Sequence, residues 1–375
     1  MRVLITGASG FIGRNLVSHL GQRRGTEILR YTREDFLCAR PIPLERVDFV
    51  FHLAGVNRPQ NLRDFTTGNA DLTYRVCEAV TTVAQSKGRK IPVLFTSSIQ
   101  AEKDNSYGES KRHAEDHLRA MASVHGVQVY LFRLPNVFGK WCRPNYNSAV
   151  ATFCHNIARD LPVHIDDPTA PLRLVYIDDV IAKFLAVLDG RPSAPDASGF
   201  IPIVPEYTTT VGEVVELIRE FRAESSTLIT RQVGTGFLRA LHSTYLSYLP
   251  PASFSYTVLK KEDPRGVFVE MQKTVDSGQI SYFTASPGIT RGGHYHHTKT
   301  EKFLVIKGRA RFRFRHIDTG ETHNLLTEGS RPEIVEAVPG WSHDITNIGQ
   351  EEMVVMLWAN EIFDQRNPDT YSLPL

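Results

Sequence analysis

The sequence predicts a doubly wound parallel α/β domain followed by an all-β sandwich or barrel, and three observations support this prediction. In residues 1–190, short apolar runs alternate with amphipathic stretches, which is typical of a parallel sheet with helices on both faces. A glycine-rich turn directly follows the first apolar run. From residue 254 onward, short alternating runs are separated by turn residues, which indicates antiparallel strands.

The expected elements follow in order along the chain. Five β-rich runs predict the parallel strands, at residues 3–6, 27–31, 47–53, 93–96 and 127–132. Amphipathic periodicity predicts helices at residues 12–20, 71–86, 109–124 and 211–222. The later strands are expected in GVFVEMQK, GQISYFTA, EKFLVIKG, RARFRFRH and EEMVVMLW. Residues 241–256 are interpreted as a linker or an extended crossover, so we expect one domain at 1–243 and another at 244–375.

Composition excludes several classes of function. The 43 Lys and Arg residues balance 41 Asp and Glu residues, which gives a formal net charge of +2. Neither a nucleic acid nor a membrane surface is therefore expected as a partner. The 4 cysteines form no CxxC pair, which argues against a disulfide framework and a thiolate zinc site. No export signal and no long apolar run is recognised, so we expect a cytoplasmic protein.

The first turn has the pattern G-x-x-G-x-x-G, formed by Gly7, Gly10 and Gly13. The first glycine permits a tight turn, the second lets the backbone approach a pyrophosphate, and the third lets helix and strand pack closely. Phe11 and Ile12 lie between the last two glycines and are included among the expected cofactor contacts. The alternative is an ordinary strand–helix turn with incidental glycines.

The end of the second strand indicates which dinucleotide binds. An NAD enzyme usually carries Asp or Glu there to accept a hydrogen bond from the ribose 2′-hydroxyl. Here the strand ends in Arg30-Tyr-Thr-Arg33, and the first acid is Glu34. A guanidinium can bind a 2′-phosphate through two hydrogen bonds, so we expect NADPH, with Arg33 ahead of Arg30. The alternative is a pair of solvated surface arginines.

A Tyr-x-x-x-Lys pair, Tyr107 and Lys111, falls on one face of a predicted helix. The preceding strand ends in Thr96-Ser97-Ser98, at the sheet edge where such folds place reactive groups. Together they supply a proton donor, a cation that lowers its pKa and a hydroxyl that polarises a carbonyl. Ser98 is preferred to Ser97 as the catalytic hydroxyl because it is the last of the three.

With these motifs, the N-terminal two thirds resembles the extended short-chain dehydrogenases/reductases. The further matching stretches are HLAG at 52–55, Asn69, RLPNVFG at 133–139 and YIDDV at 176–180. The resemblance implies a Rossmann-type fold with the backbone of Leu53 and Ala54, and Asn69, along the cofactor. It also implies that Tyr107 and Lys111 hold the nicotinamide ribose.

The same resemblance implies a nucleotide-sugar substrate. Asn136 and the loop that follows it would face this substrate. Arg173, which precedes the YIDD motif, takes the position where such enzymes often bind a pyrophosphate. Arg143, in GKWCRPNYNS, is the second candidate for that role.

A second constellation lies near the C-terminus. His294 and His296 point to the same side of a strand, Glu301 follows after a turn, and His343 comes later in the chain. Three imidazoles and a carboxylate suit Zn²⁺, Mn²⁺, Fe²⁺, Co²⁺ or Ni²⁺, and Zn²⁺ is our first expectation. His297 points the other way and is interpreted as a neighbour of the site or as solvent-facing. The alternative is a set of structural histidines.

These ligands match both motifs of the cupin family, which implies a double-stranded β-barrel with one divalent metal ion inside. The second motif departs from the family in that Pro339 is adjacent to Gly340, whereas the Gly-x-x-His-x-x-x-Asn part is intact. The following arginines alternate with apolar residues: Arg309, Arg311, Arg313 and Arg315. A solvated or dimer-facing strand is the preferred interpretation of this alternation, ahead of a basic face for an anionic nucleotide-sugar.

From end to end, the chain resembles the CapF-type capsular polysaccharide synthesis enzymes. The stretches that carry this resemblance are HLAGVNRP, SSIQA, YGESK, FGKWCRPNYNS, STYLSYLP, HHTKTEKFLV and NPDTY. It implies a soluble homodimer whose cupin domain epimerises C3 of a UDP-2-acetamido-2,6-dideoxy-4-hexulose. The reductase domain would then reduce the C4 ketone with NADPH to the L-talose derivative, a precursor of UDP-N-acetyl-L-fucosamine.

Two alternatives to this bifunctional enzyme are considered. In the first, the cupin domain only dimerises or regulates a plain NADPH-dependent 4-ketoreductase. In the second, the chain is a redox-sensing binding module that reads the NADP⁺/NADPH ratio. The Tyr-x-x-x-Lys pair argues against the second alternative, because a sensor has little need of a proton donor.

Overall fold

The computed structural model describes residues 1–366 and 368–375, and the chain divides into two compact units. The first unit contains residues 1–218 and 240–249, and the second contains residues 219–239 and 250–375. The division first crosses the chain inside helix α8 (Val211–Thr227), whereas the sequence suggests a single boundary between residues 243 and 244. Among the described residues, no helix is both long and apolar enough to span a bilayer.

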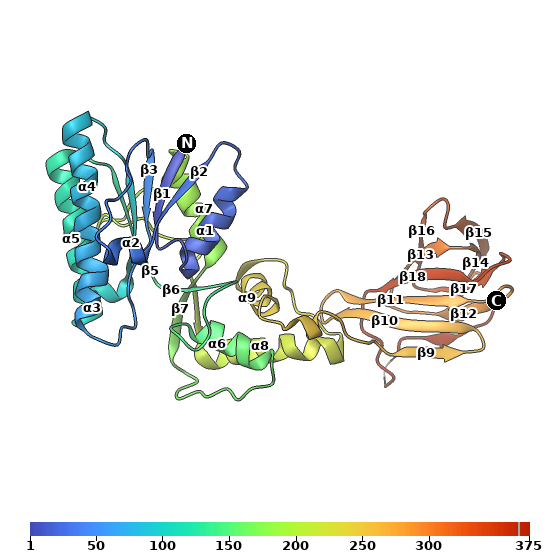
Figure 1. Ribbon diagram of the computed structural model, residues 1–375. Coiled ribbons are helices and arrows are strands. Elements are labelled where there is room, and N and C mark those ends of the chain that lie inside the picture. Colours follow the sequence, from blue (N-terminus) through green and yellow to red (C-terminus); the bar gives the residue numbers. More distant parts are fainter. Residues whose placement is uncertain (367) are drawn as a thin grey trace. The chain divides into compact units, whose positions relative to one another are not determined.

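A five-stranded parallel sheet forms the centre of the first unit (Figure 1). The strands are β1 (Arg2–Thr6), β2 (Glu27–Tyr31), β3 (Phe49–His52), β4 (Val93–Ser98) and β5 (Val129–Leu134). Their order is β2-β1-β3-β4-β5, so the direction of strand addition reverses between β1 and β3. In such sheets, ligands bind outside the carboxyl ends of the strands at this switch point.

Helices cover both faces of this sheet, as the alternating pattern predicts (Figure 1). Helices α4 and α5 lie side by side on one face, and α1 and α7 lie on the other. In α5, Ala114, Leu118 and Met121 are buried at helical spacing, so one stripe faces the core. The helices up to α7 are α1 (Phe11–Gly21), α2 (Arg33–Leu37), α3 (Arg63–Phe65), α4 (Leu72–Lys87), α5 (Ser106–His125), α6 (Ala149–Ile157) and α7 (Ile177–Leu188).

A smaller sheet extends the first unit. It contains β6 (Asn136–Phe138), β7 (Pro171–Tyr176) and β8 (Tyr207–Thr210), with β7 in the middle. Helix α9 (Gly236–Leu246) contains part of the segment that the sequence suggested was a linker. That interpretation is wrong for residues 241–249, because Tyr245 is only 2% exposed and the hydroxyl of Tyr248 donates a hydrogen bond of 2.5 Å to the carbonyl of Cys142.

The second unit contains two antiparallel sheets around one apolar core, in agreement with the predicted all-β fold. The sheet orders are β16-β13-β18-β11-β10-β9 and β15-β14-β17-β12-β19. The strands are β9 (Lys260–Asp263), β10 (Gly266–Thr274), β11 (Gly278–Ala285), β12 (Thr290–Tyr295), β13 (Glu301–Lys307), β14 (Arg309–His316), β15 (Thr322–Glu328), β16 (Ile334–Ala337), β17 (Trp341–Asn347), β18 (Met353–Ala359) and β19 (Tyr371–Ser372). The core includes Phe283, Phe303, Phe312 and Ile345.

The alternating arginines of β14 point away from this core. Ala310, Phe312 and Phe314 are buried, so the residues between them face outward. Arg313 pairs with Asp344 of the neighbouring strand. The outward direction fits the preferred interpretation of a solvated or dimer-facing strand, and a basic face for an anionic nucleotide-sugar would lie on the outer surface of this sheet.

Candidate active site and metal centre

The turn between β1 and α1 requires glycine at the first and third of its predicted positions. Gly7 has a φ of +71°, and a Cβ atom there would lie 2.7 Å from the amide nitrogen of Ala54. A Cβ atom at Gly13 would lie 2.1 Å from the carbonyl oxygen of Gly7. Helix α1 has no side-chain cap and no acidic residue in its first turn. Its terminal amide groups and its dipole are therefore available to an anion.

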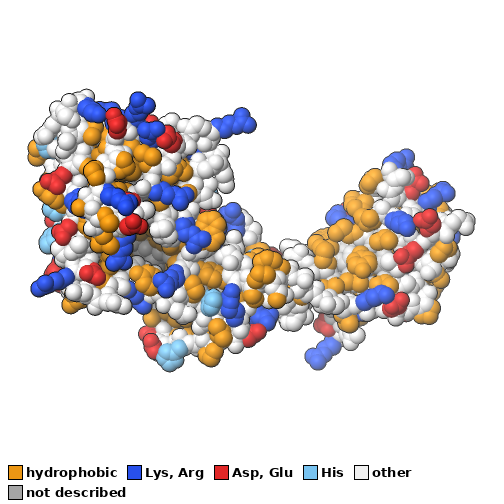
Figure 2. Space-filling model, in the orientation of Figure 1, with side chains coloured by type: hydrophobic (Ala, Val, Ile, Leu, Met, Phe, Trp, Pro, Cys, Tyr) orange, Lys and Arg blue, Asp and Glu red, His pale blue; other side chains and the backbone are white. Residues whose placement is uncertain are grey.

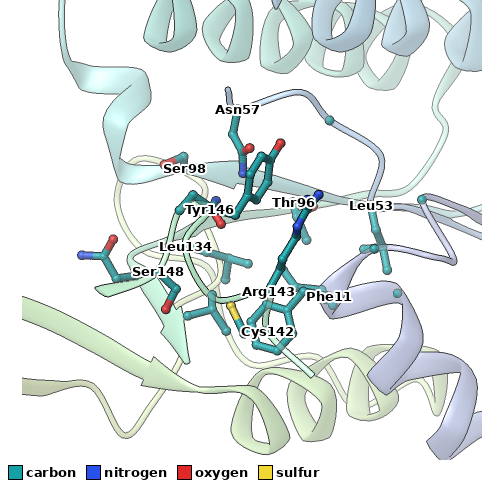
Figure 3. Close-up of a pocket in the computed structure, with 18 of the residues that line it drawn as sticks. Phe11, Leu53, Asn57, Thr96, Ser98, Leu134, Cys142, Arg143, Tyr146 and Ser148 are labelled. Carbon is teal, nitrogen blue, oxygen red and sulfur yellow. The ribbon is translucent and has the colours of Figure 1, made fainter. Parts of the chain in front are cut away.

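A cavity of about 1110 Å³ opens beside this turn, at the carboxyl ends of β4 and β5 (Figure 3). The predicted cofactor residues in its lining are Gly7, Gly10, Phe11, Ile12, Gly13, Leu53, Tyr107 and Lys111. Four cationic side chains line it, namely Arg14, Arg58, Lys111 and Arg143. Because this lining includes neither Asp nor Glu, the cavity favours polyanionic ligands, although the net charge of the chain is only +2.

Lys111 is held at the wall of the cavity by α5 and β4. The side chain is 5% exposed, and its ammonium group donates a hydrogen bond of 2.8 Å to the carbonyl oxygen of Thr96. It also lies 4.7 Å from the centre of the Phe95 ring. Burial lowers the pKa of Lys111 to about 8, although the nearby carboxylate of Glu115 acts in the opposite direction. The cation is thus placed one helical turn from Tyr107, as the sequence predicts.

Tyr107 and Ser98 face each other in the same cavity. Burial raises the pKa of the Tyr107 phenol, and a hydrogen bond with Ser98 partly opposes this rise. The phenol therefore carries its proton at neutral pH and can give it to a substrate oxygen. Ser98 ends β4, and its hydroxyl also accepts a hydrogen bond of 3.2 Å from the amide of Gln100.

Ser97 is bound elsewhere. Its hydroxyl donates a hydrogen bond to the carboxylate of Glu115, which is 3% exposed. The guanidinium of Arg133 donates two more hydrogen bonds to this carboxylate, at 2.9 and 2.6 Å. The geometry therefore favours Ser98 over Ser97 as the hydroxyl that meets a substrate.

A buried chain of hydrogen bonds fixes the loop after β3. The amide of Ala54 donates to Thr6 Oγ1 at 3.2 Å, and Thr6 Oγ1 lies 2.7 Å from Nδ1 of His52. On the other side of the ring, Nε2 lies 2.8 Å from the hydroxyl of Thr73, which donates to the carbonyl oxygen of Asn69. The hydroxyl of Thr73 is thus a donor to Asn69 and an acceptor from Nε2–H. Burial lowers the pKa of His52 to about 3, so the ring is neutral.

Asn69 acts on the cavity through this loop and does not itself line it. Its amide oxygen accepts a hydrogen bond from the backbone of Val56 at 2.8 Å. Its amide nitrogen donates to the carbonyl of Val56 and to the hydroxyl of Ser110, both at 2.9 Å. Ala54 is likewise absent from the lining, whereas its neighbours Leu53 and Gly55 are present. Cofactor contact by Asn69 and Ala54 stays a prediction, and in the structure both residues hold the loop that carries the lining residues Leu53 and Gly55.

The end of β2 offers no unpaired carboxylate to a ribose. Asp35 accepts hydrogen bonds from the amide and hydroxyl of Thr32 and from Arg40, and the bonds from Thr32 are the main cause of its lowered pKa of about 2. Glu34 also pairs with Arg40, at 3.3 Å. Arg33 begins α2 and is exposed, but it is not part of the cavity lining.

Two of the three predicted substrate residues reach the cavity. Asn136 and Arg143 line it, and the guanidinium of Arg143 lies 5.3 Å from the ring of Tyr146 (Figure 3). Arg173 lies outside the lining. It forms a two-pronged ion pair with Glu206, at 2.5 and 3.1 Å.

The predicted metal ligands come together in the second unit. His294 ends the part of β12 that pairs with β17, and it lies directly opposite His343. His296 follows β12, and Glu301 begins β13. One ligand atom from each of these four residues lies within 4.8 Å of the others. Pairing between β12 and β17 thus brings His343 next to ligands that lie far from it in the sequence.

The electrostatics of this cluster fit a divalent metal ion. Nε2 atoms of His296 and His343 lie 3.3 and 3.4 Å from the same Oε2 atom of Glu301. His343 is 3% exposed, and among the described residues its Nδ1 has no hydrogen-bond partner, while its Nε2 faces only Glu301. Unpaired buried nitrogens are costly, and a ligand that binds them removes that cost. Burial is also the main reason that the pKa of His294 is lowered to about 4, which leaves its ring neutral.

Glu301 is ionised despite its burial. Burial alone would raise the pKa of its carboxyl, but the imidazoles of His296 and His343 and the charge of Lys299 outweigh this effect and lower the pKa. Lys299 is 6% exposed, and its ammonium lies 3.6 Å from Oε1 of Glu301. His297 is exposed and lies outside the cluster, as the alternation along the strand predicts.

Comparison with known proteins agrees with both halves of this description. Residues 3–197 match the NAD dependent epimerase/dehydratase family, and residues 261–371 match the polysaccharide biosynthesis C-terminal domain. A UDP-2-acetamido-2,6-beta-L-arabino-hexul-4-ose reductase from Pseudomonas aeruginosa is 59% identical over 372 residues, which cover 99% of this chain and 98% of the relative. The crystal structure of the capsular polysaccharide assembling protein CapF from Staphylococcus aureus is 40% identical over the whole of both chains, with a TM-score of 0.89. The chain belongs to the CapF-type capsular polysaccharide synthesis enzymes.

A crystal structure of CapF with the inhibitor 3-isopropenyl-tropolone is also similar, with 37% identity over the whole of both chains and a TM-score of 0.84.

Two arginines that line the cavity of this CapF-type chain, Arg14 and Arg58, are not among the residues predicted from the sequence. Arg14 directly follows the third glycine, and its guanidinium lies 5.4 Å from the ring of Trp141. Arg14 lies in the first turn of α1, beside the glycine turn that is expected to bind a phosphate, and this position could have predicted its place in the cavity. Arg58 lies in the loop after HLAG and had no comparable signal.

Proposed function

We propose that this chain is a bifunctional nucleotide-sugar enzyme of capsular or surface polysaccharide synthesis in the cytoplasm. The second unit would epimerise C3 of a UDP-2-acetamido-2,6-dideoxy-4-hexulose. The first unit would then reduce the C4 ketone with NADPH to UDP-2-acetamido-2,6-dideoxy-L-talose, on the route to UDP-N-acetyl-L-fucosamine. The observation that carries this proposal is the coexistence, in one chain, of a Tyr107–Ser98 pair in a cationic cavity and a buried three-histidine, one-carboxylate cluster. The similarity to the Pseudomonas reductase supports the reductase half.

The reduction follows from the chemistry of the cavity. NADPH, when bound against the glycine turn, supplies the hydride for the ketone carbon. Tyr107 gives its proton to the ketone oxygen, and Ser98 orients that oxygen by a hydrogen bond. Lys111 places a positive charge one turn from the phenol, which favours the phenolate left after proton transfer. Arg143 and Asn136 lie on the same wall and would bind the nucleotide-sugar.

NADPH is preferred to NADH because of the groups at the end of β2. Asp35 and Glu34 are already paired with Arg40, so neither carboxylate is free to accept a hydrogen bond from a ribose 2′-hydroxyl. Arg33 is exposed at the start of α2, where a guanidinium can reach a 2′-phosphate. The paired carboxylates and the exposed guanidinium both favour NADPH over NADH.

For the epimerisation, His294, His296, Glu301 and His343 would hold one divalent metal ion, with Zn²⁺ as the first choice. When bound, the ion supplies a Lewis acid for a carbonyl oxygen. The C4 ketone makes the neighbouring C3 proton acidic, so removal and return of this proton on opposite faces inverts the carbon. Glu301, His297 or a hydroxide ion would act as the base.

A homodimer is the proposed assembly, and the outer face of the larger barrel sheet supports it. Leu304 lies opposite both Ile334 and Met356, and Met356 lies opposite Tyr282, so an apolar row crosses four strands. Three of these side chains are exposed: Ile334, Met356 and Tyr282. Figure 2 shows hydrophobic side chains gathered on this side of the barrel. A second copy would bury this row.

Incubation of the enzyme with the UDP-linked 4-keto sugar in D₂O, with and without NADPH, tests the proposal by NMR. Without NADPH, we expect deuterium at C3 and a second ketone epimer. With NADPH, we expect oxidation of the cofactor and the L-talo product. A product reduced at C4 with retained C3 configuration would contradict the bifunctional assignment.

The apolar sheet face also favours one alternative, in which the cupin unit only dimerises or regulates a plain 4-ketoreductase. Treatment with a chelator distinguishes the two. The bifunctional enzyme should lose C3 exchange and keep NADPH binding. Exchange at an unchanged rate in metal-free protein would favour the alternative.

A further inference from the structure

The end of the chain is built into the barrel next to the metal ligands. Strand β19 (Tyr371–Ser372) pairs with β12, and Ser372 lies opposite His294 in this pairing. The carbonyl of Leu373 accepts a hydrogen bond of 2.5 Å from the hydroxyl of Ser342, in β17. The C-terminal segment therefore contacts both strands that carry histidine ligands.

Within this segment, the carboxylate of Asp369 binds the loop between β12 and β13. It accepts hydrogen bonds from the three successive amides of residues 297–299, at 3.0, 2.9 and 2.8 Å, and from the hydroxyl of Thr298 at 3.0 Å. This loop connects the ligands His296 and Glu301. Four hydrogen bonds from one loop to one carboxylate fix its path between the two ligands.

The backbone carbonyl of Asp369 acts on His296 directly. It lies 2.6 Å from Nδ1 of the ring. A carbonyl oxygen can only accept a hydrogen bond, so Nδ1 carries a proton, and Nε2 is the ring nitrogen left to present a lone pair to a metal ion. That Nε2 atom faces the cluster, 3.3 Å from Oε2 of Glu301. The carbonyl therefore selects the ring nitrogen that can bind a metal ion.

Asp369 also acts on a second ligand, Glu301, through Lys299. Its amide is one of the three held by Asp369, and its buried ammonium lies 3.6 Å from Oε1 of Glu301. The ring of Phe363 lies 5.6 Å from the same ammonium. The charge on Oε1 is thus matched by Lys299, while Oε2 faces the imidazoles of the cluster.

The geometry points to Asp369 as the positioning residue of the metal centre. Its carbonyl sets the tautomer of His296, and its carboxylate fixes the loop that places Lys299 against Glu301. This inference rests on the proposed function of the cluster as a site for a divalent metal ion. Outer hydrogen-bond partners of metal ligands typically change metal affinity by about 10- to 100-fold.

Competition between the protein and a chelator for Zn²⁺ tests this role in the full-length enzyme. We expect Asp369→Asn to raise the Zn²⁺ dissociation constant by about 10- to 100-fold. Asp364→Asn is the matched control, because this aspartate is exposed and, among the described residues, accepts a hydrogen bond from the amide of Arg366 alone. The control should bind Zn²⁺ as the wild type does. A lower melting temperature of the metal-free variant together with an unchanged Zn²⁺ dissociation constant is the result that a merely structural role would give.

The outcomes separate this inference from the proposed function. If the wild type binds no Zn²⁺, the proposed metal centre is wrong. If the wild type binds Zn²⁺ and Asp369→Asn binds it with the same constant, only the role of Asp369 is overturned. Should the variant not fold, ¹⁵N NMR of histidine-labelled wild type with Zn²⁺ decides the matter. We expect a protonated Nδ1 and a metal-bound Nε2 at His296, and the reverse assignment would overturn the inference.

Discussion

Ser97 donates its hydroxyl hydrogen bond to the buried carboxylate of Glu115, and this contact separates the roles of two adjacent serines. Successive side chains of a strand point to opposite faces. The commitment of Ser97 to one side therefore leaves Ser98, the last residue of β4, for Tyr107 on the other side.

This difference predicts opposite effects for two alanine substitutions. Ser98→Ala should lower kcat for NADPH oxidation by about 100-fold at an unchanged melting temperature, because the substrate oxygen loses its positioned donor. Ser97→Ala should leave kcat nearly unchanged and lower the free energy of unfolding by about 1–3 kcal/mol, because a buried carboxylate loses a donor. Steady-state kinetics and thermal unfolding of both variants measure these effects. The reverse pattern would assign the catalytic hydroxyl to Ser97.

Several site residues could be predicted from the sequence because local rules place them. The requirement for glycine at position 7 follows from a positive φ and a close backbone approach, both of which a strand–turn–helix pattern implies. The two-residue period of a strand predicts that His294 and His296 converge, and both belong to the cluster although His296 lies just after β12. The pairing of His294 with His343 is non-local, so strand periodicity alone does not predict it.

Other features depend on tertiary packing and could not be predicted in this way. Net charge is a sum over the whole chain, so it conceals a cavity that gathers Arg14 and Arg58 and excludes acids. The hydrogen bonds of Asn69 to Val56, in the loop after β3, and to Ser110, in α5, depend on the packing of these elements and could not be predicted from the sequence. The polar and aromatic residues of α9 suggested a linker, and only the packed structure buries Tyr245 among them.

Lys111 should make the stability of the first unit depend on pH. Its pKa is lowered from 10.5 to about 8 by burial, so the folded state binds fewer protons than the unfolded state between these values. The wild type therefore gains stability as the pH rises through this range, by about 2 kcal/mol between pH 8 and pH 10 relative to Lys111→Met. Urea unfolding at both pH values measures the difference. A gap that stays constant with pH would show that Lys111 keeps an ordinary pKa in the folded protein.

Arg33 should determine the choice of cofactor. Arg33→Ala should raise the KM for NADPH by about 10-fold or more and leave the KM for NADH unchanged, because only NADPH carries the 2′-phosphate. Arg30→Ala is the matched control from the same strand end, and a smaller effect is expected. Equal losses with both cofactors would place Arg33 outside the 2′-phosphate site. In that case Arg14, which lines the cavity, becomes the next arginine to substitute.

The two sites should be separable by single substitutions and then restored by mixing. His294→Ala removes one of four clustered ligands, so C3 exchange in D₂O should fall by at least about 100-fold. Tyr107→Phe removes the proton donor, so it should stop NADPH oxidation and spare C3 exchange. His323→Ala, an exposed histidine of β15 outside the cluster, should change neither activity.

A mixture of the His294 and Tyr107 variants should form the reduced product from the starting ketone, because each variant performs the step that the other lacks. NMR of the mixture, compared with each variant alone, measures this restoration. Loss of both activities in each folded variant, with no restoration on mixing, would mean that the two units do not divide the reaction between them. Restoration requires that the epimerised ketone leaves the cupin unit of one variant and enters the reductase unit of the other. It therefore tests both the location of the two steps and their order, epimerisation before reduction.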